Sequence, residues 1–191
     1  MGLYIGVISG TTVLVAVGNL LFSRAALGIS PLYCIVAAVL TTVAIIALDG
    51  LEAWLIRLLP EKWFAAEQPL FAISARECRF YNRLGVKAWR NKVPELGSFT
   101  HFSKSHVADP KDNAYLRRFL LESNYGVVIH LTNALSGYLL CLLFPAAQVL
   151  RFPLPCAVVN MVLSLLPVFI LRYNTPRLQS LIHLNERRAA S

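Results

Sequence analysis

Four long stretches of this 191-residue chain contain no Asp, Glu, Lys or Arg, and they limit its possible folds more than any other feature. The stretches are residues 2–22, 25–48, 123–150 and 152–170. A helix that crosses the hydrocarbon core of a bilayer needs about 20 mainly apolar residues. We therefore expect an all-α integral membrane protein with four transmembrane helices, at about 2–22, 25–48, 124–149 and 152–171.

The basic residues predict how these spans are oriented. The central segment 50–122 contains twelve Lys and Arg residues and the tail 172–191 contains four, whereas the two short loops contain one each, Arg24 and Arg151. Cytoplasmic loops of membrane proteins carry an excess of Lys and Arg. We expect a single membrane domain, 1–191, with the central segment, the tail and both termini on the cytoplasmic side.

The central segment has the composition of a chain that lies on a membrane surface. Residues 51–59 predict a short interfacial helix that ends at Pro60, and residues 69–97 mix aromatic with basic side chains. We expect a cytoplasmic-side interfacial helical cap over 50–122. Its bases either anchor it to anionic lipid or bind a headgroup, a coenzyme A phosphate or a sugar phosphate. Attraction to lipid headgroups accounts for the net charge of +8, so no nucleic-acid partner is expected.

His130 is an ionisable side chain inside the third predicted span. Such a residue is costly in a bilayer, faces protein or water, and is by default a functional-site hypothesis. Neutral imidazole is a common general base near pH 7. The alternative is a structural histidine that hydrogen-bonds to a neighbouring span, and the candidate partners are Asn19, Asn133 and Asn160. The residues alone leave both interpretations open.

A helix that starts near Asp109 and Pro110 and continues into the third span would carry both Glu122 and His130. Asp is a good N-cap and Pro suits the first helical position. In a straight helix the two functional candidates differ by about 80° around the axis and about 12 Å along it, so they are not in direct contact. We expect His130 to act as the general base and Glu122 to orient it or balance its charge.

A compact polar string, RYNTPRL at residues 172–178, follows the fourth span. A positive anchor at the membrane surface explains Arg172 and Arg177 but not the whole string. Pro176 is expected to fix a turn. We interpret Arg172, Asn174 and Arg177 as binding residues for an anionic donor or headgroup.

The string resembles a motif of the bacterial glycosyl-4,4'-diaponeurosporenoate acyltransferase family, which acts in the synthesis of staphyloxanthin-type carotenoids. Other short motifs resemble that family in the same order, over about residues 70–180. They are Glu77, Arg79, Phe80 and Tyr81, then Leu84 to Lys87, Trp89, Lys92, Pro94, Glu95 and Gly97, then Phe102, Lys104 and His106, and finally Tyr115, Leu116, Phe119, Glu122 and His130. The chain differs from the pattern at Val127, where the family often has an acid, and at residues 123–125, where a basic continuation is expected.

The resemblance implies a membrane acyltransferase of a bacterial cell membrane that moves a fatty acyl group onto a hydroxyl of a lipid or glycolipid. The acyl donor would be a molecule such as acyl-CoA or an acyl lipid, and the family's acceptor is a glycosyl carotenoid. The residues expected to hold substrate are Lys87, Trp89, Lys104, His106, Arg172, Asn174 and Arg177.

Two alternatives stay open from the sequence. The chain could be a non-enzymatic membrane partner or assembly subunit of a lipid-processing complex, in which case replacing His130 would leave function intact. It could also be another four-span lipid-modifying enzyme. The four cysteines have neither the spacing of a zinc site nor that of a redox pair, so we expect no metal and no cofactor other than the acyl donor.

Overall fold

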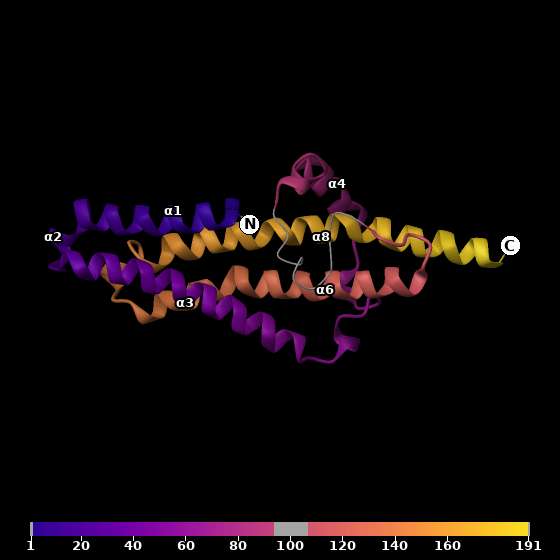
Figure 1. The fold of residues 1–191 in the computed structure, drawn as a ribbon, viewed down its shortest axis with the longest axis horizontal. Helices are drawn as coiled ribbons and strands as arrows, with labels where there is room; N and C mark the ends of the chain where they lie inside the picture. Colours follow the sequence, from indigo (N-terminus) through magenta and orange to yellow (C-terminus); the bar gives the residue numbers. More distant parts are fainter. Residues whose placement is uncertain (1, 94–106, 191) are drawn as a thin grey trace. The chain divides into compact units, whose positions relative to one another are not determined.

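The computed structural model describes residues 2–93 and 107–190, which form helices joined by turns (Figure 1). Four helices are long and apolar enough to cross a membrane, at Gly2–Leu27, Pro31–Arg57, Asn113–Leu143 and Pro153–Ala190. The expected all-helical chain with four such helices is therefore confirmed for the described residues. The chain divides into two compact units. Unit 1 comprises Met1–Leu55 and Ile129–Leu165, and unit 2 comprises Ile56–Val128 and Leu166–Ser191.

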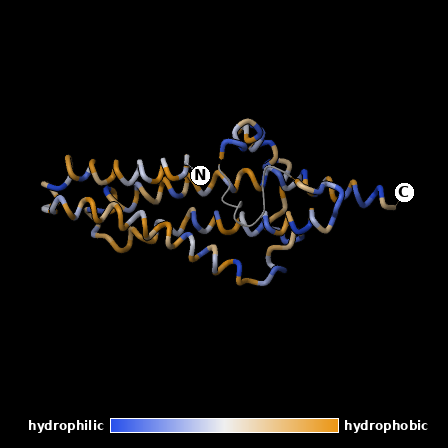
Figure 2. Tube along the Cα trace, viewed as in Figure 1, coloured by the Kyte–Doolittle hydropathy of each residue, from blue (hydrophilic) through white to orange (hydrophobic). Residues whose placement is uncertain are grey.

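Unit 1 is built from the more apolar helices of the chain, and Figure 2 shows hydrophobic residues along most of α1 and α3. Its elements are α1 (Gly2–Gly18), the π-helical turn η1 (Asn19–Ser23), α2 (Arg24–Leu27), most of α3 (Pro31–Arg57), the end of α6 (Asn113–Ser136), the 3₁₀ segment η6 (Gly137–Leu143), α7 (Ala146–Val149) and the start of α8 (Pro153–Ala190). A buried cluster of Val15, Ala37, Ala38, Ile45, Phe152 and Cys156 holds α1, α3 and α8 together.

The turn between the first two spans follows from local chemistry. Gly28 has a φ of 64°, a left-handed conformation that glycine adopts at little cost and that commonly ends a helix. The Ser30 hydroxyl then accepts a hydrogen bond from the Tyr33 backbone N–H at 3.1 Å, and Pro31 occupies the first position of α3.

Unit 2 contains shorter elements packed on the remaining parts of α6 and α8. They are the 3₁₀ turns η2 (Glu61–Trp63), η3 (Pro69–Phe71) and η4 (Arg90–Lys92) and the helices α4 (Ala75–Arg83) and α5 (Val86–Trp89). One buried cluster joins α6 to α8 through Leu116, Phe119, Leu120, Leu178 and Ile182. A second joins α4 and α5 to α8 through Tyr81, Val86, Ile170 and Tyr173.

Three local predictions are wrong. Residues 51–57 are not a separate interfacial helix, because α3 continues unbroken to Arg57. The helix expected to start at Asp109 starts at Asn113, where the Asp112 carboxylate accepts a hydrogen bond from Ala114 N–H at 2.8 Å. The turn expected at Pro176 is absent, since α8 runs through this proline to Ala190.

Candidate functional site

The first arginine of the RYNTPRL string is held by protein groups in unit 2. Arg172 donates to both carboxylate oxygens of Glu77, from Nε at 2.5 Å and from Nη2 at 3.0 Å. It also donates to the backbone carbonyls of Leu70 at 2.9 Å and Ala72 at 3.3 Å. The guanidinium therefore fastens α8 to the start of α4 and to the turn that precedes it.

Glu77 is positioned by its own helix and by a tyrosine one turn later. The Ser74 hydroxyl caps α4 by accepting a hydrogen bond from the Glu77 backbone N–H at 3.1 Å. The Oε1 of Glu77 accepts from the Tyr81 hydroxyl at 2.5 Å. The hydrogen bonds from Arg172 lower the pKa of Glu77 below its usual value. Burial, together with the bond to Glu77, raises the pKa of Tyr81. Glu77 is thus a carboxylate and Tyr81 a neutral donor over the physiological range.

The rest of the string gathers around the ring of Tyr173. The Arg177 guanidinium carbon lies 4.5 Å from the ring centroid, and its Nη2 donates to the Tyr173 hydroxyl at 2.7 Å. Arg90 lies 6.0 Å from the same centroid and donates to Asn174 Oδ1 at 2.9 Å. Two guanidinium groups therefore converge on one aromatic ring.

Neither Arg90 nor Arg177 has a carboxylate within ion-pair distance among the described residues. The Nε–H of Arg90 is buried and donates to no group in that part of the chain. Arginine presents planar donors that match phosphate and carboxylate groups. The pair is therefore suited to an anion, and Arg90 is a candidate that sequence reasoning missed.

The structure brings four of the seven expected binding residues into this neighbourhood of unit 2. Arg172, Asn174 and Arg177 follow one another on α8, and Trp89 packs against the cluster that contains Tyr173. The Trp89 indole donates to the Leu84 carbonyl at 3.0 Å, while Lys87 is exposed on the same short helix. Lys104 and His106 lie outside the described residues.

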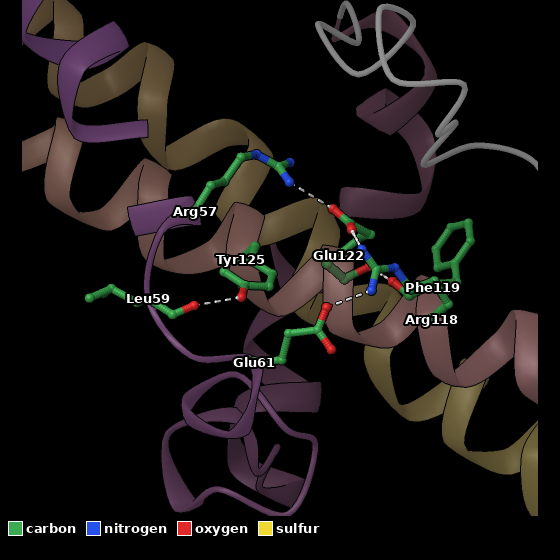
Figure 3. A network of polar contacts seen from close by, with 8 residues as sticks. Arg57, Leu59, Glu61, Arg118, Phe119, Glu122 and Tyr125 are labelled. Carbon is green, nitrogen blue, oxygen red and sulfur yellow. Dashed lines mark hydrogen bonds and ion pairs between the residues drawn. The ribbon is translucent and has the colours of Figure 1, made fainter. Parts of the chain in front are cut away.

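Glu122 lies in a network of charges in unit 2 (Figure 3). Its Oε2 accepts from Arg57 at 3.1 Å and its Oε1 from Arg118 at 2.7 Å, and Arg118 also pairs with Glu61 at 2.8 Å. The Glu122 side chain is 16% exposed. The hydroxyl of Tyr125, one turn later, donates to the Leu59 carbonyl at 3.1 Å. Glu122 therefore holds α6 to the end of α3, and Arg118 and Tyr125 hold it to the segment that follows.

His130 belongs to unit 1, where it is partly buried on α6. Asn133 follows it by three residues, so the two side chains lie on adjoining parts of one helix face. In the orientation that satisfies both the oxygen and the nitrogen of its side-chain amide, Asn133 donates to Glu52 Oε2 at 3.0 Å. Asn160 of α8 donates to the Asn133 carbonyl at 2.9 Å and to Asp49 Oδ1 at 3.2 Å. Two carboxylates of α3 therefore meet two amides, and one of these amides, that of Asn133, lies one turn along α6 from the histidine.

Sequence reasoning named the two asparagines only as possible partners of His130 and missed both acids. A signal was present, because Asp49 and Glu52 are the first charges after the uncharged stretch 25–48 and stand three residues apart. That spacing places both acids on one face of α3. Glu122 lies in unit 2, whereas the two carboxylates of α3 lie in unit 1 with His130.

A second histidine of the described chain lies in unit 2. His183 lines a hollow of about 320 Å³ with Ala66, Arg117, Leu120 and Ile182 among its walls. Glu186 contacts the His183 ring at 3.3 Å and pairs with Arg117 at 2.7 Å. The His183 side chain is 74% exposed, so it provides a control for replacement of the other histidine.

Comparisons with known proteins add the family. A model of the family described as glycosyl-4,4'-diaponeurosporenoate acyltransferase matches residues 60–184, about two thirds of the chain. Neither the comparison with curated proteins nor that with solved structures gave a match. The matched range contains Tyr173 with the arginines around its ring, and also Glu122 and His130. The family description is the one that the sequence motifs resemble. The chain belongs to the glycosyl-4,4'-diaponeurosporenoate acyltransferase family and is an acyltransferase.

Proposed function

We propose that this enzyme transfers a fatty acyl group from an activated donor to a sugar hydroxyl of a membrane glycolipid, with His130 as the general base. The observation that carries the proposal is the set of polar side chains near His130 in unit 1. In this acyltransferase His130 lies in a span, and Asn133, one turn later on the same helix, donates to Glu52. Asn160, which donates to the Asn133 carbonyl, also donates to Asp49. Intramembrane ionisable residues mark functional sites, because their burial in lipid is costly.

In the proposed reaction the neutral imidazole of His130 removes the proton from the acceptor hydroxyl. The oxygen attacks the acyl carbonyl carbon, an ester bond forms and the bond to the donor's leaving group breaks. The proton then passes from the imidazolium to the leaving group, so the histidine is regenerated. Glu52 and Asp49 would stabilise the imidazolium while it carries the proton, and Asn133 and Asn160 would hold these carboxylates in place.

The donor would be held by the cations around Tyr173. Arg90 and Arg177, which have no acid partner among the described residues, would contact a phosphate of the donor. Asn174 and the exposed Lys87 would contribute polar contacts, and Trp89 would provide apolar surface. Arg172 would act indirectly, because its donors are used by Glu77 and two backbone carbonyls.

The test is acyl transfer by the full chain reconstituted in lipid vesicles, with palmitoyl-CoA as the donor probe and a glycosyl carotenoid acid as the acceptor. The product is an acylated glycoside, measured by mass spectrometry. His130→Ala should lower kcat by about 100-fold or more, the usual contribution of a general base. The matched control, His183→Ala, should keep activity within about twofold. Activity of His130→Ala equal to that of the control would refute the assignment.

The non-enzymatic alternative gives a different result in the same assay. An assembly subunit would produce no acylated glycoside in the purified state, whatever residue stands at position 130. Family membership favours the enzyme.

A further inference from the structure

A groove in unit 1 contains polar groups that the proposed reaction does not use. It has a volume of about 390 Å³ and is lined by residues of α1, η1, the turn before α8 and the start of α8: Thr11, Leu14, Val15, Gly18, Asn19, Ser23, Arg151, Pro155 and Val159. Most of these side chains are apolar or small. All lie in unit 1, and none of those on α1 or η1 falls in the range matched by the family.

One end of the groove has a concentrated positive charge. Arg151 donates to the Ser23 hydroxyl, and its backbone carbonyl accepts from Asn19 Nδ2 at 2.8 Å. No carboxylate of the described residues lies within ion-pair distance of Arg151. Arg24, which follows Ser23, is exposed. The charge of this end is therefore positive and is not balanced by the described part of the chain.

Asn19 gives an independent indication of a ligand. The residue is 4% exposed and uses both amide hydrogens, toward Val15 and Arg151. Its carbonyl oxygen is buried and accepts no hydrogen bond from the described residues. Buried polar atoms without a partner are rare and costly. The surrounding turn η1 is π-helical, a local form that is frequent at functional sites.

We propose that this groove binds an anionic phospholipid with a hydroxylated headgroup. The phosphate contacts Arg151, a headgroup hydroxyl donates to Asn19 Oδ1, and an acyl chain lies along Leu14, Pro155 and Val159. Charge complementarity selects this occupant, because an arginine without an acid partner at the end of an apolar groove matches a molecule with a phosphate at the end of an acyl chain.

The experiment titrates delipidated full-length protein with single lipids and counts bound lipid by native mass spectrometry. The probes are dioleoylphosphatidylglycerol, dioleoylphosphatidylcholine, which lacks the headgroup hydroxyls and the net charge, and glucosyl diacylglycerol, which lacks the phosphate. The wild type should bind phosphatidylglycerol at least about tenfold more tightly than either other lipid, as expected for hydrogen bonds to a charged group. Equal affinity for all three lipids would overturn the proposal, and so would a preference for glucosyl diacylglycerol.

Variants separate this site from general surface charge. Arg151→Gln should abolish the preference for phosphatidylglycerol, whereas Arg83→Gln, the same change at the exposed end of α4, should keep it. Loss of the preference in both would assign it to net charge and overturn the site. Val159→Trp fills the groove without touching a charge, so it keeps the proposal testable if Arg151→Gln does not fold. It should lower the affinity for every lipid with two acyl chains, and unchanged affinity would contradict the placement of the chain.

Discussion

Replacing Glu77 with Gln should destabilise the protein far more than the same change at Glu186. Both acids are paired with an arginine, Glu77 with Arg172 and Glu186 with Arg117. The side chains of the first pair are 22% and 15% exposed, and those of the second are 42% and 60% exposed. The substitution is the same at both positions, but the Glu77 pair is more buried and makes two hydrogen bonds where the Glu186 pair makes one.

The magnitude follows from the bonds that Glu77→Gln removes. Glu77 accepts two charge-assisted bonds from Arg172, and each bond of this type contributes about 1.5–3 kcal/mol. A glutamine oxygen keeps one of them, and partial exposure reduces the penalty for the unpaired guanidinium, so we expect a loss of about 2 kcal/mol. For a chain of this size that lowers Tm by about 4–8 °C. The exposed pair contributes about 0–1 kcal/mol, so Glu186→Gln should lower Tm by about 4 °C at most.

The assay is thermal unfolding of the purified protein in one detergent, followed by intrinsic fluorescence of the tryptophans. Equal shifts for the two variants would refute the reasoning, because neither burial nor the second hydrogen bond would then make a difference. The double variant Glu77→Gln, Arg172→Gln should recover part of the loss, since it leaves no uncompensated guanidinium. A double variant less stable than the sum of the single changes would contradict that account.

Three further predictions concern pH, packing and catalysis. The pKa of Glu77 is lower in the folded chain than in the unfolded chain. The contribution of Glu77 to stability is therefore complete above the unfolded pKa of about 4.3 and is lost as the pH falls through the folded pKa. The Tm of Glu77→Gln should fall less with acidification than the Tm of the wild type. Gly126→Ala should lower Tm, because the new Cβ would lie 2.9 Å from Leu171 Cδ1, whereas Gly137→Ala meets its neighbours at 3.5 Å or more and should leave Tm unchanged or raise it. Glu52→Gln should lower kcat for acyl transfer by about tenfold or more with the donor KM within about twofold, and a kcat equal to that of the wild type would separate this carboxylate from the reaction.

Much of the fold could be predicted from the sequence because a bilayer imposes one dominant condition. Long uncharged stretches have to become helices, since every backbone group must be paired inside the segment. The ends of the helices were harder to predict. Asp109 and Asp112 both accept hydrogen bonds from the backbone N–H groups that follow them, and the sequence does not show which of the two begins the helix. Pro176 lies inside α8 because buried neighbours, Leu171 and Leu178, hold the helix across it.

The sequence pointed to several residues of the candidate site but not to the contacts between them. The string at 172–178 was named, and its members do gather in unit 2, but the partner of Arg172 is Glu77, 95 residues earlier in the chain. A single sequence has no local pattern that specifies such a pair. The same limit applies to Asp49, whose amide partner Asn160 comes from another span. Whether His130 and Glu122 act in catalysis stays a prediction.

The division of the chain into two units has a consequence for its synthesis. Each unit consists of an early and a late segment, and both late segments include part of α8. While the ribosome is still making α6, the Glu77 carboxylate lacks its arginine and the Asp49 carboxylate lacks its amide. Neither unit can complete its native contacts until the final helix has been translated, so the surfaces of α4 and of the end of α3 that contact α8 stay uncovered until then. We expect the insertion machinery and chaperones to act on these surfaces during that interval.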